Sequence, residues 1–210
     1  MEAHSDLFSA PWLRQIIALI QNNASDEAYV LAEYFPPTIA RKLVQCVALL
    51  SLHNTAQATT LLKTIDTMQI LVPDFAYLAK EVDIDLQSVG LKAIENKHLD
   101  VGQLCLEAYL FLHPESVQTF IDGIISLASE ALSADNANLS RTCLNRALQL
   151  DRSPSRLIQY AEAVLTHPNI SSYDSLSAFA RALIYQALDQ LPQEDVNNRL
   201  KIAILLARNG

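Results

Sequence analysis

The stretch LSRTCLNRALQLDRSPSRL, residues 139–157, decides the fold class of this chain. It places Ser140, Leu144 and Ala147 at helical spacing, so that two small side chains flank a large one on one face. Small residues let a second helix approach closely, while the large residue fills the space beside it. The Ser-Pro pair at 153–154 predicts an N-cap and the first turn of another helix. The stretch is therefore interpreted as a joint between two packed helices.

Helical periodicity extends over most of the chain, as in the apolar stripe that begins with Leu13 and Ile16. Helices are predicted over residues 11–22, 25–36, 38–53, 55–67, 83–97, 100–112, 115–133, 137–150, 154–166, 173–190 and 193–208. Residues 68–82 are predicted as a connector and a short helix, because Pro73 excludes one continuous helix interior. A short strand at 69–72 is the alternative. Loops are short, so consecutive helices are expected to pack antiparallel.

Several residues mark predicted helix starts. Ser25 is predicted as an N-cap, with Asp26 and Glu27 in the first turn, where the helix dipole favours anions. Pro114 and Pro192 each fit the first turn of the helix that follows, where a missing N–H costs nothing.

Composition favours an all-helical protein. Half of the residues (50%) are apolar and 18% are charged, which argues against disorder over most of the length. The chain has 4 glycines, hence few positions suited to tight β-turns. The 15 lysines and arginines are scattered and the net charge is −8, which argues against nucleic-acid binding. Three cysteines without a CxxC pair and no N-terminal leader pattern predict a cytoplasmic protein, or a nuclear one in a eukaryotic cell.

The spacing of Ser140, Leu144 and Ala147 recurs in three segments, 83–114, 121–152 and a third that begins at Leu157. The matching second-helix positions are Gly102, Leu106, Tyr109 and Pro114; then Ser140, Leu144, Ala147 and Arg152; then Ala180, Ile184, Ala187 and Pro192. Internal spacings are identical in the first two segments, whereas the third has a longer link between its helices. Such segments must stack, because no helix pair can bury its apolar face alone.

This pattern resembles the tetratricopeptide repeat, a helix–turn–helix unit of about 34 residues. The resemblance implies an all-α fold, a right-handed superhelical array of antiparallel hairpins with about 10–12 helices in a single domain. The implied parts are degenerate repeats at 11–67, a connector at 68–82, clearer repeats at 83–192 and a capping helix at 193–210. Arg199, Lys201 and Arg208 are expected to make the outer face of this capping helix polar. Leu86, Ile124 and Leu157 stand where the family has tryptophan, so a degenerate helical repeat of another kind is the alternative.

In the resembled family, the first helix of each repeat lines a concave groove that binds a partner. The positions carried over are Ile84, Gln87, Leu91 and Ile94; Asp122, Ile125, Ser129 and Leu132; and Ser155, Ile158, Glu162 and Leu165. None is basic, which argues against a clamp for an acidic peptide. The apolar members suit an apolar or amphipathic helix, and Asp122 and Glu162 are expected to pair with basic residues flanking it. Alternatively, the N-terminal helices or a dimer partner cover these residues.

The sequence contains none of the motifs GxxxxGK[ST], GxGxxG and GxSxG. His53, His113 and His167 are expected near helix C-termini, and Cys105 and Cys143 as small core residues. We therefore expect no enzyme activity, no cofactor and no metal.

The expected function is a protein–protein interaction scaffold or adaptor, a subunit of a larger assembly that binds an apolar or amphipathic segment of a partner protein. A secretion-type chaperone that holds an aggregation-prone client and a regulatory subunit of an enzyme are the alternatives. Membrane insertion is not expected, because no segment approaches the roughly 20 apolar residues of a membrane span. Homo-oligomerisation stays open.

Overall fold

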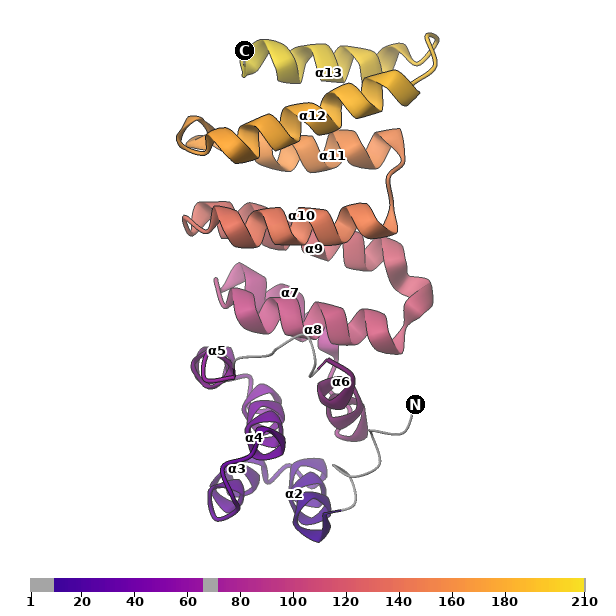
Figure 1. The fold of residues 1–210 in the computed structure, drawn as a ribbon. Coiled ribbons are helices and arrows are strands. Elements are labelled where there is room, and N and C mark those ends of the chain that lie inside the picture. The colour runs from indigo at the N-terminus through magenta and orange to yellow at the C-terminus, as the bar shows by residue number, and fades with distance from the viewer. Residues whose placement is uncertain (1–9, 66–71, 210) are drawn as a thin grey trace. The chain divides into compact units, whose positions relative to one another are not determined.

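The computed structural model describes residues 10–65 and 72–209. These residues form twelve α-helices and two short 3-10 helices, and they contain no strand (Figure 1). The all-helical prediction is therefore confirmed for this part of the chain. The chain divides into two compact units, Met1–Ser116 and Val117–Gly210.

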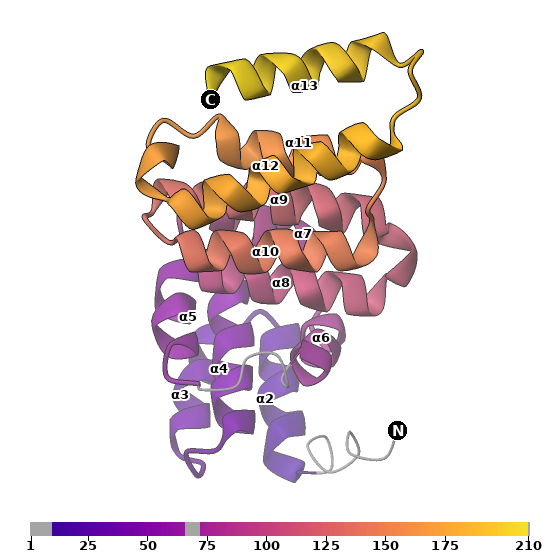
Figure 2. The same ribbon diagram turned by 45° about the horizontal axis from the view of Figure 1, so that its top comes forward.

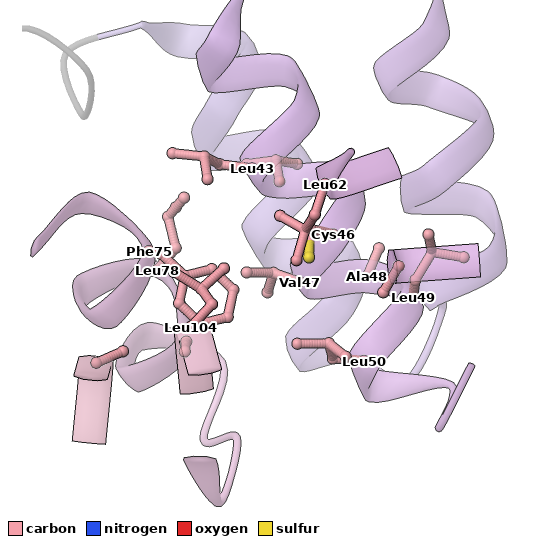
Figure 3. Packing of buried hydrophobic residues seen from close by; sticks show 14 of the residues in the cluster. Leu43, Cys46, Val47, Ala48, Leu49, Leu50, Leu62, Phe75, Leu78 and Leu104 are labelled. Carbon is pink, nitrogen blue, oxygen red and sulfur yellow. The ribbon is translucent and has the colours of Figure 1, made fainter. Parts of the chain in front are cut away.

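The first unit is built around one central helix. Its elements are α2 (Pro11–Gln21), α3 (Ser25–Glu33), α4 (Ile39–Ser51), α5 (Thr55–Leu62), α6 (Val72–Glu81), α7 (Leu86–Glu95), α8 (Leu99–Leu112) and the 3-10 helix η2 (Pro114–Ser116). Helix α4 packs against α2, α3, α5 and α6, and all of its residues from 43 to 50 are buried. A helical segment that is buried on every side lies at the centre of a core. Figure 3 shows Val47 of α4 pointing toward Phe75 of α6, with Leu78 and Leu104 beside them.

The second unit consists of helices that pack on their neighbours. Its elements are α9 (Val117–Ser133), α10 (Ala137–Leu150), α11 (Pro154–Leu165), the 3-10 helix η3 (Ile170–Ser172), α12 (Asp174–Gln190) and α13 (Val196–Arg208). Helix α9 packs on α10, α11 packs on both α9 and α12, and α13 contacts α11 and α12 (Figure 2). The longer link that the sequence places between the last two repeat helices contains η3.

The joint at residues 139–157 has the predicted packing but a different cap. Ser140, Leu144 and Ala147 are fully buried on α10. Ser153 occupies the N-cap position of α11 with an extended backbone, yet its hydroxyl does not cap the helix, which corrects the prediction. Its backbone N–H instead donates to Asp151 Oδ1 at 2.8 Å. That hydrogen bond lowers the pKa of the Asp151 carboxyl, because it stabilises the ionised form.

Other predicted helix starts are shifted by a few residues. Helix α3 has Ala24 at its N-cap, and Ser25, predicted as the cap, is the buried first residue of the helix. Helix α13 begins after Asp195, whose carboxylate accepts from the backbone N–H of Asn198, so Pro192 lies in the preceding turn. Pro73 lies in the first turn of α6, which confirms the short helix predicted there. The alternative strand at 69–72 falls almost entirely outside the described residues.

Five helix ends share one geometry that the sequence did not suggest. A residue with positive φ follows each of α2, α4, α6, α7 and α9: Asn23, His53, Asp83, Lys97 and Asp135. The next N–H then donates to a carbonyl five positions back, as Ala24 to Leu19, Asn54 to Leu49, Ile84 to Ala79, His98 to Ala93 and Asn136 to Ala131. This is the Schellman ending of a helix, which usually uses glycine. The same helix ending therefore recurs in both units.

Replacing Lys97 with glycine is expected to stabilise the protein by about 1 kcal/mol, because the left-handed backbone costs a residue with a Cβ roughly this much. The matched control is Lys92→Gly, on an exposed position inside α7, which should destabilise by about 1 kcal/mol. Urea unfolding followed by circular dichroism measures both. Destabilisation by Lys97→Gly would contradict the assigned joint.

Helices α7 and α8 approach closely at two glycines. A Cβ on Gly102 would lie 2.5 Å from Ile94 Cγ1 and 3.3 Å from the Gly90 carbonyl oxygen. Ile94 is itself buried, so it has little room to move. At Gly90 the nearest atom to an added Cβ is Cys105 Cβ, at 3.1 Å. The small residues therefore set the distance between the two helices.

Gly102→Ala is expected to destabilise the first unit by about 1–2 kcal/mol, because overpacking exceeds the gain in helix propensity. Gly90→Ala is the matched control, since its looser contact lets the propensity gain offset the crowding. Its unfolding free energy should stay within about 0.5 kcal/mol of wild type. Chemical denaturation gives both values, and equal stability of Gly102→Ala and wild type would refute the close approach.

Candidate interaction surfaces

The residues predicted to line a concave groove differ in how much surface they expose. In the first unit, Leu91 is exposed, Gln87 is half-buried, and Ile84 is half-buried in the turn before α7. Their neighbour Ile94 is buried. Among Ile84, Leu91 and Ile94, Leu91 therefore exposes the most apolar surface to a partner.

In the second unit the predicted positions divide between surface and core. Asp122 is exposed on α9, where Ile125 and Ser129 are half-buried; Leu132 is buried. On α11, Ser155 is exposed and Glu162 half-buried. Ile158 and Leu165 are 1% and 3% exposed, so in this conformation they pack inside the chain and offer a partner almost no surface.

Both acidic groove positions have a cation within their own unit. Asp122 Oδ1 lies 2.6 Å from Arg156 Nη1, and the same guanidinium donates to Gln118 and Gln159. Glu162 Oε2 lies 2.5 Å from Lys201 Nζ on α13. A basic residue of a partner would therefore have to displace Arg156 or Lys201 to reach these carboxylates. The sequence could not show this, because these pairs join different helices.

The cysteines and histidines lie where the sequence placed them. Cys46, Cys105 and Cys143 are buried free thiols. Burial raises the pKa of Cys46 to about 12, and burial, together with Cys46, raises that of Cys105. His53, His113 and His167 each follow the end of a helix. Over residues 10–65 and 72–209, no three His, Cys, Asp or Glu side chains gather in a group that fits a metal ion.

The last helix presents an apolar outer face, whereas its charged residues predict a polar one. Val196, Leu200 and Ile204 are 67%, 59% and 43% exposed and follow one another at intervals of one helical turn. Together with the exposed Ala203 and Ala207 they form what we call the α13 stripe. Ile202 and Leu205, on the opposite face, are buried against the unit.

The centre of this face stays apolar because the cationic side chains of Arg199 and Lys201 bind groups of their own unit. Arg199 donates from Nε to the Pro192 carbonyl at 3.0 Å and from Nη2 to the Leu191 carbonyl at 2.8 Å, so it caps the end of α12. Lys201 pairs with Glu162. Lys201 and Arg208 flank the α13 stripe on one side, by helical spacing, and leave its centre apolar.

A second apolar surface lies in the first unit. An open groove of about 460 Å³ is lined by Leu19 of α2, by Asp26, Glu27, Val30 and Leu31 of α3, and by Tyr34, the C-cap residue of α3. We call it the α2–α3 groove. Tyr34 is 81% exposed and Val30 52%.

No family model, curated protein or solved structure matches the chain. None of the described helices is both long enough and apolar enough to cross a membrane.

Proposed function

We propose that this chain is a protein–protein interaction scaffold or adaptor that docks an amphipathic helix of a partner protein along the α13 stripe. The supporting fold features are helices that pack on their sequence neighbours and one helix-ending joint used five times. They agree with the resemblance to tetratricopeptide repeats. We extend the proposal to antiparallel hairpins within each unit, arranged as in a right-handed array.

The observation that carries the proposal is the exposure of Val196, Leu200 and Ile204 at helical spacing. Large apolar side chains in one contiguous exposed row are uncommon on a protein surface and mark interaction sites. A row spaced by four residues matches the seam that a second helix forms when it packs lengthwise. The α13 stripe therefore suits a partner helix with its own apolar row.

Charge next to the stripe selects the kind of helix. Arg208 lies along one side of the stripe by helical spacing, whereas Lys201 on the same side is already paired with Glu162. Glutamate or aspartate beside the apolar row of the partner would complement Arg208, whereas lysine or arginine would be repelled. The occupant is thus an amphipathic helix with acidic flanks.

The test uses a synthetic helix of about 20 residues with a leucine row flanked by glutamates. Leu200→Asp is expected to weaken binding about tenfold or more, because it places a charge in the centre of the apolar contact. Since Leu200 is 59% exposed, the thermal unfolding of the variant should match wild type. Fluorescence anisotropy of the labelled peptide measures the dissociation constant.

Leu52→Asp is the matched control, a leucine exposed in the first unit, outside both candidate surfaces. It should leave the affinity unchanged. Leu91→Asp examines the predicted concave groove as the competing location for the same helix. Loss of binding by Leu91→Asp, with Leu200→Asp unaffected, would move the site from α13 to that groove.

A further inference from the structure

The α2–α3 groove combines an apolar floor with an acidic edge. Leu19, Val30, Leu31 and Tyr34 supply the apolar lining, and two of them are more than half exposed. Tyr34, the C-cap residue of α3, keeps a helical backbone and follows Val30 by four residues, so their side chains lie next to each other on the same face. Apolar surface of this kind gains free energy when a partner covers it.

Two carboxylates, Asp26 and Glu27, belong to the same lining. They lie in the first turn of α3, whose N-cap residue Ala24 offers no side-chain cap. In the part of the chain that the structure describes, no lysine, arginine or histidine forms an ion pair with either of them. Asp122 and Glu162 in the second unit, by contrast, each have a cation at hydrogen-bonding distance. The negative charge at the edge of the groove therefore stays available to a ligand.

From these features we infer that the α2–α3 groove binds a partner segment in which an apolar side chain is followed closely by lysine or arginine. The apolar side chain covers Val30 and Tyr34, while the cation reaches Asp26 or Glu27. The occupant is the electrostatic opposite of the acidic helix proposed for the α13 stripe. The two surfaces thus recognise different chemistry, and this inference does not depend on the proposed function.

One residue gives this groove its own spectroscopic signal. Trp12 is the only tryptophan of the chain. Its ring stacks on Phe35, with ring centroids 4.9 Å apart, and Phe35 directly follows Tyr34 in the sequence. Selective excitation of tryptophan therefore reports on the end of α3 that lines the groove.

The test titrates the full chain with a tryptophan-free amphipathic peptide of leucine and lysine, and in parallel with its leucine–glutamate counterpart. The leucine–lysine peptide is expected to change Trp12 fluorescence and to bind at least about tenfold more tightly than the glutamate peptide. The double substitution Asp26→Asn, Glu27→Gln should weaken binding about tenfold and flatten its dependence on salt. Val30→Asp should abolish binding to the groove without changing thermal unfolding.

A charge-matched control uses Asp189→Asn with Glu194→Gln, two exposed carboxylates in the second unit. This pair should leave the affinity for the leucine–lysine peptide unchanged. Equal weakening by both double variants would mean that the peptide senses only net charge and would overturn the inference. It would also be overturned by sedimentation of the chain as a dimer that Val30→Asp dissociates, because a second copy would then occupy the groove. Val30→Asp should leave binding of the glutamate-flanked helix at α13 intact, which separates this test from that of the proposed function.

Discussion

Replacing Ile158 with aspartate is expected to unfold the second unit. Ile158 is 1% exposed on α11, which packs against α9, α12 and α13. The substitution removes a buried aliphatic side chain and leaves a carboxylate without water, at a cost of about 3–5 kcal/mol or more. A large fall in the melting temperature measured by circular dichroism is the expected result.

Ile125→Asp is the comparison variant, because Ile125 is half-buried on α9. Its carboxylate keeps contact with solvent, so the loss of stability should be clearly smaller. If Ile158→Asp instead melted like wild type and lost partner binding, Ile158 would belong to an interface, as the family pattern implied.

Phe75→Ala is expected to destabilise the first unit by about 3–5 kcal/mol. Phe75 is fully buried on α6 and faces Val47 of the central helix α4 (Figure 3). Its removal leaves a cavity that Leu78 and Leu104 cannot fill without leaving their own contacts. Urea unfolding gives the change in free energy.

Tyr77→Ala, on the same helix, is the control for Phe75→Ala. Tyr77 is partly exposed and stacks edge-on against Phe111, with ring centroids 5.6 Å apart. Its loss should cost about 1 kcal/mol, the scale of one aromatic pair. Equal effects of the two substitutions would contradict the assignment of Phe75 to the centre of the core.

Helix positions could be predicted from the sequence because apolar periodicity is local information. The row of Leu13, Ile16 and Ile20 defines a buried face whatever the helix packs against. The small–large–small order of Ser140, Leu144 and Ala147 indicated burial for the same reason.

Helix ends and side-chain directions were harder to predict. Lys97 and His53 adopt a backbone conformation usually taken by glycine, and their residue types do not indicate it. Arg199 and Lys201 were assigned to the outer face of the last helix by charge alone. Their partners are carbonyl groups at the end of α12 and the carboxylate of Glu162 on α11, so only the packed helices reveal their direction.

The α13 stripe and the α2–α3 groove could not be predicted from the sequence for a related reason. Leu200 and Ile202 are both aliphatic residues of one helix, yet the first is exposed and the second buried. Sequence periodicity shows that the two lie on different faces, but the choice of inner face depends on how α11 and α12 meet α13. The same holds for Val30, whose exposure follows from the packing of α2 on α3.

Hydrogen–deuterium exchange of the wild-type chain, with and without the glutamate-flanked synthetic helix, tests the docking of a partner helix on α13 most directly. Binding is expected to slow amide exchange in Val196–Arg208, because the docked helix suppresses local opening there. Exchange in the helices that carry Leu91 and Asp122 should stay unchanged. Protection of those two helices, with no change in α13, would contradict the proposed docking site.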